Sequence, residues 1–279
     1  MSGFPNVSAM TTLITGATGH LGSLIVEHVL NRIPAAELAV SVRDPEKASA
    51  LAARGVDVRH GDFTRPETLR TAFAGVDKLV LVSIDGPDEE RVEAHRAAVA
   101  AAKEAGVSFI AYTSVTDADT SPLILAKVHK ATEEAISATG IPHAFLRNGM
   151  YHENYTPALA QGALVHAAGD GRIASASRDD LAEAAAVVIT SDGHDNATYE
   201  LTGPTAWSFA ELAELGGVEH RAITPQERQA QLASFGLPEF LAELLTDIEA
   251  NIAKGVLSEV RPDLEKLLGR TPRSIQQAL

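Results

Sequence analysis

The sequence contains no cysteine among its 279 residues. Disulfide bonds, thiolate zinc sites and cysteine nucleophiles are therefore excluded. No run of about 18 apolar residues is present, so we expect no transmembrane helix. The first eleven residues lack the basic and apolar segments of a signal peptide, and we expect them to form a loose leader before the first strand. These absences are compatible with the cytoplasm, where we expect the protein to act.

Positive charge is scarce, with 23 lysines and arginines against 37 aspartates and glutamates and a net charge of −14. A nucleic-acid surface needs clustered basic residues, so this balance argues against one. An anionic cofactor must then be held by local donors rather than by long-range attraction. No group of histidines and carboxylates has the spacing of a metal site, and we predict no metal. Hydrophobic residues make up 45% of the chain, enough for a large core in one domain or in one domain with an appended lobe.

A glycine-rich turn stands near the start of the chain, between an apolar strand at residues 12–14 and a helix. The helix is indicated by apolar residues at helical spacing, Leu21, Leu24, Ile25 and Val29. In this context Gly16 permits a tight bend, Gly19 lets the backbone approach a pyrophosphate, and Gly22 lets the helix pack on the strand. Free N–H groups at the helix start face the phosphates. An ordinary strand-to-helix turn is the alternative. We predict a pyrophosphate site formed by Gly16, Ala17, Thr18, Gly19, His20, Leu21 and Gly22.

Arg43 and Asp44 directly follow a second strand at residues 38–42. About 20 residues beyond the glycines, an acidic residue typically holds the ribose 2′-hydroxyl of NAD, whereas an arginine holds the 2′-phosphate of NADP. Because Arg43 comes first, we predict a preference for NADPH, and because Asp44 stands beside it, we expect NADH to bind more weakly rather than to be excluded. The alternative is a solvated arginine at a strand end.

Strands and helices continue to alternate along the chain. Strands are predicted at residues 56–60, 78–83, 108–114 and 142–147, with helices between them. This order predicts an α/β fold with a right-handed, doubly wound parallel sheet of the Rossmann type. We expect His95, on the helix after the fourth strand, to be solvated or packed against a neighbouring helix.

Two predicted turns follow the carboxyl ends of strands, the side of a parallel sheet where ligands bind. Ser83, Ile84 and Asp85 leave the fourth strand there. Asp62 and Phe63 follow the third strand, where Asp62 could accept from the adenine amino group and Phe63 could pack on the adenine ring. A solvated turn is an equal alternative for these two residues.

The pattern changes after residue 155. We expect residues 1–155 to form the NADP-binding Rossmann core and residues 156–279 to form a smaller, mostly helical lobe on the substrate side. An alanine-rich helix at about residues 178–190 is expected to pack back on the core, and residues 198–202 are predicted to form a late strand.

The usual catalytic pair of short-chain dehydrogenases is missing. In that pair, Tyr-x-x-x-Lys, the lysine lowers the pKa of the tyrosine so that it can protonate a carbonyl oxygen. Here Tyr112 is followed four positions later by Thr116, and the next tyrosine is Tyr151. A quinone needs such a relay much less, because hydride transfer leaves a stabilised phenolate. Positioning the nicotinamide against a flat acceptor then supplies most of the rate.

Several of these stretches together resemble the NmrA-like, atypical short-chain dehydrogenases, and among them the bacterial NADPH:quinone oxidoreductase type 2 and triphenylmethane reductase group. The resemblance covers essentially the whole chain, and the Leu-Arg-Asn-Gly and Gly-Asp-Gly-x-Ile-Ala-Ser stretches are its most specific parts. It is carried by residues 15–22, 41–47, 109–114, 125–133, 146–154 and 167–178.

The resemblance implies contacts to the ribose and nicotinamide side of the cofactor. These contacts fall on Ser83, Ile84, Asp85, Arg147, Asn148, Gly149, Met150, Tyr151, His152 and Arg178. The turn of residues 83–85 departs in sequence from the quinone reductases, so only its backbone role carries over. Asn148 and Tyr151 lie just past the sixth strand, where their amide and phenol groups could orient the carboxamide or an acceptor oxygen.

His129 is the titratable residue to which the resemblance draws attention. Many NmrA-like proteins place a lysine thirteen residues before a Gly-Ile-Pro proline, and counting back from Pro142 gives His129. A histidine at this place is usual in the quinone and dye reductase group. His129 could touch the nicotinamide ribose or donate toward the acceptor. The alternative is a helix histidine bonded to backbone near the cofactor.

The sequence therefore predicts an NADPH-dependent enzyme that transfers a hydride to a quinone or a similar planar, electron-poor acceptor. His129, Asn148 and Tyr151 are its candidate catalytic residues, in positioning roles. A redox sensor that binds NADP(H) without turnover and a reductase of triphenylmethane-type dyes are the alternatives. We expect a monomer or homodimer with no nucleic-acid or membrane partner.

Overall fold

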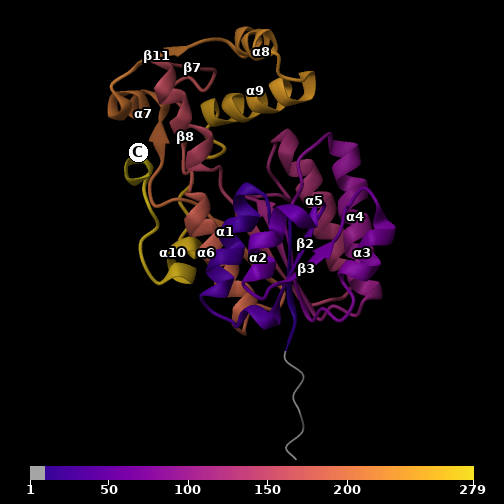
Figure 1. Cartoon of the computed structure of the whole chain (residues 1–279). Helices are drawn as coiled ribbons and strands as arrows, with labels where there is room; N and C mark the ends of the chain where they lie inside the picture. Colours follow the sequence, from indigo (N-terminus) through magenta and orange to yellow (C-terminus); the bar gives the residue numbers. More distant parts are fainter. Residues whose placement is uncertain (1–9) are drawn as a thin grey trace, which may run out of the picture.

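A seven-stranded parallel sheet forms the centre of the computed structural model, which describes residues 10–279 (Figure 1). Most of the expected leader lies outside the described residues. The strand order is β3-β2-β1-β4-β5-β6-β9, and every pairing is parallel. The predicted doubly wound sheet is thus confirmed. The strands are β1 (Thr12–Thr15), β2 (Leu38–Val42), β3 (Asp57–His60), β4 (Lys78–Leu81), β5 (Phe109–Val115), β6 (His143–Asn148) and β9 (Ala197–Leu201).

The central strands are buried on both faces, as their apolar, β-branched sequences require in a parallel sheet. Helices α1 (His20–Leu30), α2 (Ser49–Ala53), α6 (Arg178–Thr190) and α10 (Asp263–Leu268) lie on one side (Figure 1). Helices α3 (Pro66–Ala72), α4 (Asp88–Glu104) and α5 (Ile124–Ser137) cover the other. The alanines of α6 are buried, and these small side chains let it pack along α1.

A smaller lobe lies beyond the carboxyl ends of the strands (Figure 1). It contains two short two-stranded sheets, one parallel and one antiparallel, besides its helices. Its elements are β7 (Ala163–His166), β11 (Glu219–Ala222), β8 (Arg172–Ile173), β10 (Trp207–Ser208), α7 (Phe209–Gly216), α8 (Pro225–Ser234) and α9 (Glu239–Ala253). The chain returns from this lobe to the sheet twice, first through α6 and β9 and again through α10, which packs on α6 and β9.

Two features differ from, or go beyond, what the sequence patterns indicated. The late strand, predicted without a partner at residues 198–202, is β9 and joins the main sheet beside β6. His95 is fully buried, so the expectation of a solvated residue is wrong and packing against the neighbouring helix is correct. Every helix within residues 10–279 is too short or too polar to cross a bilayer.

Candidate functional site

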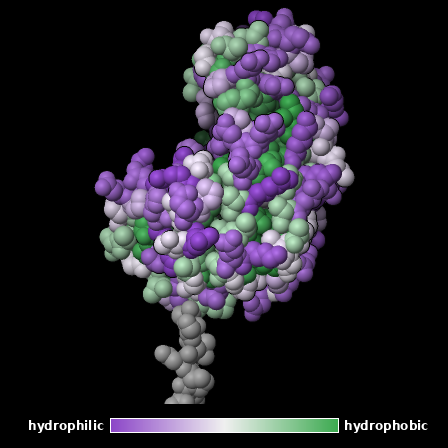
Figure 2. Space-filling view, turned by 90° about the vertical axis from the view of Figure 1, so that its right-hand side faces the viewer, coloured by the Kyte–Doolittle hydropathy of each residue, from purple (hydrophilic) through white to green (hydrophobic). Residues whose placement is uncertain are grey.

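A notch separates the lobe from the parallel sheet and its flanking helices. It is visible on the left side of the space-filling view (Figure 2). The carboxyl ends of the parallel strands point toward the lobe (Figure 1). The strand order reverses direction between β1 and β4, which is the place where α/β sheets bind ligands. The turns that leave β1, β2, β4 and β6 therefore meet at this side of the sheet.

The glycine turn after β1 has the geometry that its sequence requires. Gly16 has a φ of +63°, a conformation that favours glycine. A Cβ added at Gly22 would overlap the Gly16 carbonyl oxygen and would lie 2.7 Å from its carbonyl carbon. Only glycine at position 22 therefore lets α1 approach the turn this closely.

The start of α1 presents unused backbone donors. Gly19 is the N-cap, with no side-chain cap, and the first turn of the helix holds no acidic residue. The N–H groups of His20, Leu21 and Gly22 bond to no other backbone group in the described part of the chain. Thr18, Gly19 and His20 are exposed. These donors and the positive end of the helix dipole suit a phosphate group.

Arg43 lies just past β2, beside the glycine turn, because Ser41 pairs with Thr15. Its side chain is exposed and makes no hydrogen bond or ion pair with any residue of 10–279. Asp44 is used differently, since its carboxylate caps the next turn by accepting from the Glu46 N–H at 3.2 Å. Arg43 is therefore the side chain at this strand end that is available to a ligand anion.

Asp62 and Phe63, which were expected at the adenine, both have partners within the protein. The Asp62 carboxylate closes the turn before α3, accepting from the Thr64 N–H at 3.0 Å and from the Thr64 hydroxyl at 2.8 Å. Phe63 is only 8% exposed, and its ring packs edge-on against His95. Local turn closure and core packing thus engage both side chains, and the adenine contacts expected of them stay predictions.

Side chains of β5 and α4 accept hydrogen bonds from the backbone of the turn after β4. The Ser83 N–H donates to the Thr113 hydroxyl at 2.9 Å, and the Ile84 N–H donates to His95 Nε2 at 3.1 Å. Asp85, the next residue, is exposed. The backbone of this turn is therefore fixed at the carboxyl edge of the sheet, whatever its side chains do.

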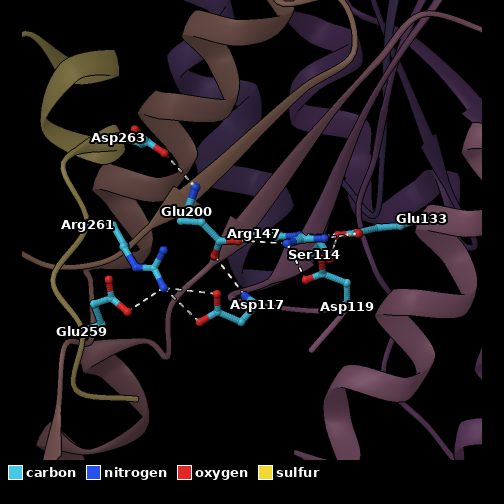
Figure 3. Close-up of polar contacts among 9 residues, drawn as sticks. All are labelled: Ser114, Asp117, Asp119, Glu133, Arg147, Glu200, Glu259, Arg261 and Asp263. Atoms are coloured by element: carbon cyan, nitrogen blue, oxygen red, sulfur yellow. Dashed lines mark hydrogen bonds and ion pairs between the residues drawn. The ribbon is translucent and has the colours of Figure 1, made fainter. Parts of the chain in front are cut away.

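Arg147 was expected near the cofactor, but its guanidinium is engaged elsewhere (Figure 3). It donates to both carboxylate oxygens of Glu133, at 2.7 and 3.0 Å, and to Glu200 at 3.0 Å. A further hydrogen bond of 2.9 Å reaches Asp119. The Arg147 side chain thus ties β6 to α5 and β9, and the contact with the cofactor expected at this position stays a prediction.

His152 is also structural. Its Nδ1 lies 2.7 Å from the Ser175 hydroxyl and its Nε2 lies 3.0 Å from the Arg273 carbonyl oxygen, so both ring nitrogens are used. Met150 is buried in the core of the lobe. Gly149 passes closely between backbone oxygens, since a Cβ there would lie 3.1 Å from the Leu201 carbonyl oxygen. These three residues shape the chain after β6, and the cofactor contacts expected of them stay predictions.

Asn148 and Tyr151 are the remaining polar side chains of this stretch, and they lie beside each other. Asn148 is buried, and its Oδ1 has no hydrogen-bond partner in the described part of the chain. The Arg178 guanidinium lies 5.0 Å from the centre of the Tyr151 ring and donates to Asn154 at 2.7 Å. Burial raises the pKa of Tyr151, so its phenol stays protonated. An unpartnered amide oxygen is a feature that a polar ligand group would complete.

His129 pairs with Tyr112, a partnership that the sequence did not suggest. The Tyr112 hydroxyl lies 2.9 Å from His129 Nδ1, and the Thr132 and Ser83 hydroxyls also lie close to it. We assign the fully buried hydroxyl as the donor to Nδ1, because a buried donor without an acceptor is costly. His129 then carries its proton on Nε2, which has no described partner and is not enclosed. Burial lowers the pKa of His129 well below its ordinary value, so the ring is neutral.

Arg91 was missed altogether. It is 5% exposed on the inner face of α4, and its Nη2 donates to the Ser83 hydroxyl at 3.1 Å. The segment around it, Asp88–Glu104, begins with three acidic residues and resembles a solvated helix. Its helical spacing to His95 was the one available signal, since residues four apart share a helix face.

The chain is similar to known NAD(P)H-binding proteins. The NAD(P)H-binding family matches residues 16–192. Quinone oxidoreductase 2 of Escherichia coli strain K12 is 43% identical over 276 residues, covering 95% of this chain and 96% of that protein. The structure of Citrobacter sp. triphenylmethane reductase complexed with NADP(H) superposes with a TM-score of 0.91 at 40% identity, covering 96% and 98% of the two chains. The E. coli quinone oxidoreductase QOR2 complexed with NADPH gives a TM-score of 0.91 at 42% identity, with the same coverage.

Proposed function

The chain belongs to the NAD(P)H-binding family, and from that premise we propose that it binds NADPH and transfers a hydride to a quinone or a similar planar, electron-poor acceptor. One observation carries the proposal: a glycine turn with open N–H groups stands at the switch point of a chain that is 43% identical, over nearly its whole length, to quinone oxidoreductase 2. The NmrA-like resemblance seen in the motifs agrees with these relatives.

The residues present fit a bound dinucleotide phosphate. The N–H groups of residues 20–22 would hold the pyrophosphate, and Arg43 would hold the 2′-phosphate through charge-assisted hydrogen bonds. The backbone of residues 83–85 would line the ribose. Asn148 Oδ1, which lacks a partner, would accept from the carboxamide, with Tyr151 beside it. The cofactor, once bound, supplies the hydride.

His129 would act as a neutral hydrogen-bond donor. Its Nε2–H, fixed by the Tyr112 hydroxyl on the other side of the ring, would donate to the acceptor oxygen that gains negative charge. The nicotinamide ribose is the alternative partner for the same N–H. Both roles need a neutral ring with one defined tautomer, and the buried Tyr112 hydroxyl supports that arrangement.

The test is to mix purified protein, NADPH and a panel of benzoquinones and naphthoquinones, and to follow the loss of the reduced-nicotinamide absorbance. A protein-dependent loss is expected, and the Gly22→Ala variant serves as the matched control without a working phosphate turn. If NADPH binds but no acceptor is reduced, the chain is a redox sensor rather than an enzyme.

A second candidate acceptor is a triphenylmethane dye. The 40% identity and TM-score of 0.91 to the Citrobacter reductase favour it. The same assay with a cationic dye in place of the quinone tests it. We also propose that the protein acts in the cytoplasm and that it is a monomer or homodimer. Light scattering on purified material would check the oligomeric state.

A further inference from the structure

Arg91 is a buried cation without a counter-charge. Among residues 10–279 it forms no ion pair, and its Nε is enclosed without any hydrogen-bond partner. Its one polar contact is the Ser83 hydroxyl, at 3.1 Å. The other deeply buried arginine, Arg147, has three carboxylates around it. Buried charges are normally paired, so an unpaired one indicates a group that is kept for something other than stability.

The groups around Arg91 do not neutralise it. His95 Nε2 accepts from the Ile84 N–H, so its Nδ1 carries the proton and donates to the Thr132 hydroxyl at 3.0 Å. Tyr112 is assigned as the donor to His129 and is itself neutral. Burial, and after it the charge of Arg91, lowers the pKa of His95 to about 4 and that of His129 well below its ordinary value. These groups are all neutral and do not compensate the positive charge of Arg91, and no carboxylate of residues 10–279 lies within 4.0 Å of its guanidinium.

Arg91 lies under the acceptor end of the proposed site. Ser83, which it contacts, directly follows β4, and the β4 residue Leu81 pairs with Tyr112 on β5. Tyr112 in turn reaches His129 on α5. The guanidinium therefore sits between the ends of β4 and β5 and helix α5, beneath the surface on which the nicotinamide would lie. Its charge acts there through a low-dielectric layer rather than by contact.

We propose that Arg91 determines acceptor specificity by charge, favouring acceptors that become anions over acceptors that are cations. This inference rests on the proposed function. A quinone is neutral; it gains two electrons and one proton as the hydride while the cofactor is oxidised, becomes a hydroquinone anion, and then takes a second proton from water. A cationic dye accepts the same hydride at carbon and becomes neutral. The positive charge of Arg91 beneath the site stabilises the hydroquinone anion and repels the cationic dye.

The proposal predicts a specific division between kcat and KM. Both acceptors gain one negative charge, so removing the positive charge of Arg91 lowers kcat for both. Only the dye is charged before the reaction, so only its KM falls when the repulsion is removed. The ratio of kcat/KM for quinone to kcat/KM for dye therefore falls, by about tenfold for a buried charge in this position.

The experiment compares Arg91→Gln, which removes the charge, with Arg91→Lys, which keeps it. Arg96→Gln is the matched control, because Arg96 is exposed on the same helix. A benzoquinone and a cationic triphenylmethane dye are assayed at saturating NADPH. We expect the quinone-to-dye ratio to fall about tenfold in Arg91→Gln and to stay near the wild-type value in the other two variants. Ser83→Asp, which places a carboxylate beside Arg91, should lower the ratio as well and provides a second test if Arg91→Gln does not fold.

An unchanged ratio in folded Arg91→Gln, or an equal loss for both acceptors with unchanged KM values, would overturn the inference and leave the proposed function intact. A wild-type protein that binds NADPH but reduces neither acceptor would overturn both. If the wild type reduces only the quinone, the dye is followed as a competitive inhibitor, and the inference requires it to inhibit Arg91→Gln more strongly.

Discussion

Replacing Gly22 by alanine should abolish tight NADPH binding while leaving most of the fold in place. The added Cβ would lie 2.7 Å from the Gly16 carbonyl carbon, whereas carbon atoms pack at about 3.5 Å or more. The turn must therefore open by about 0.8 Å or more, which moves the N–H groups of residues 20–22 away from the phosphate oxygens. Hydrogen bonds to charged groups contribute about 1.5–3 kcal/mol each, so losing one or two weakens binding by about tenfold to several hundredfold or more.

Titration calorimetry with NADPH measures this effect, and thermal unfolding is followed in parallel. Gly140→Ala is the matched control, since Gly140 has a φ of +76° with open space around it, so alanine there strains the backbone far from the turn. We expect both variants to lose some stability but only Gly22→Ala to lose affinity. Wild-type affinity in Gly22→Ala would refute the assignment of the turn to the pyrophosphate.

Four further predictions concern Arg43, Tyr112, Arg147 and His95. Arg43→Ala should weaken NADPH by about tenfold or more and NADH little, because a charge-assisted contact to the 2′-phosphate is lost; an equal loss in both titrations would make Arg43 structural. Tyr112→Phe removes the hydroxyl that fixes the tautomer of the His129 ring. It should lower kcat for quinones about tenfold, measured by steady-state kinetics, and leave the NADPH affinity unchanged, measured by titration. Arg147→Met should cost about 3–5 kcal/mol of unfolding free energy in urea melts, since it leaves buried carboxylates unpaired, without changing the NADPH affinity of the folded fraction. His95 should make the fold acid-sensitive, because burial, and after it the charge of Arg91, lowers its pKa from 6.5 to about 4 on folding. The unfolded chain therefore binds the extra proton first, and the free energy of unfolding drops by up to about 3 kcal/mol as the pH falls from 6.5 toward 4. Urea midpoints measured between pH 7 and pH 4 should lose this pH dependence in His95→Gln.

The parts of the fold that the sequence predicted are those set by local rules. The glycine turn is one, because Gly16 needs its positive φ and Gly22 needs its missing Cβ for reasons that involve only neighbouring residues. The parallel sheet is another, because alternating buried strands and helices leave few topologies. The place of β9 beside β6 could not be predicted, since it depends on where the chain returns after the lobe.

Side-chain directions at the site were much harder to predict. Arg147 and Asn148 are adjacent at the end of β6, yet successive strand residues point to opposite sides, so one reaches Glu133 and the other keeps a buried oxygen without a partner. Only tertiary packing brings Arg91 to Ser83 and Tyr112 to His129. Tyr112 and His129 are far apart in the sequence, and the helix that carries Arg91 looks solvated there. A motif therefore locates a functional stretch but does not say which of its side chains face the ligand.

The central claim is that the glycine turn holds NADPH and that the protein passes its hydride to a quinone. The most direct measurement is a single-turnover reaction of the NADPH-loaded protein with a benzoquinone, with oxidised cofactor and hydroquinone quantified together. We predict that they appear one to one and much faster than without protein. NADPH that stays bound and reduced at saturating quinone would contradict the account.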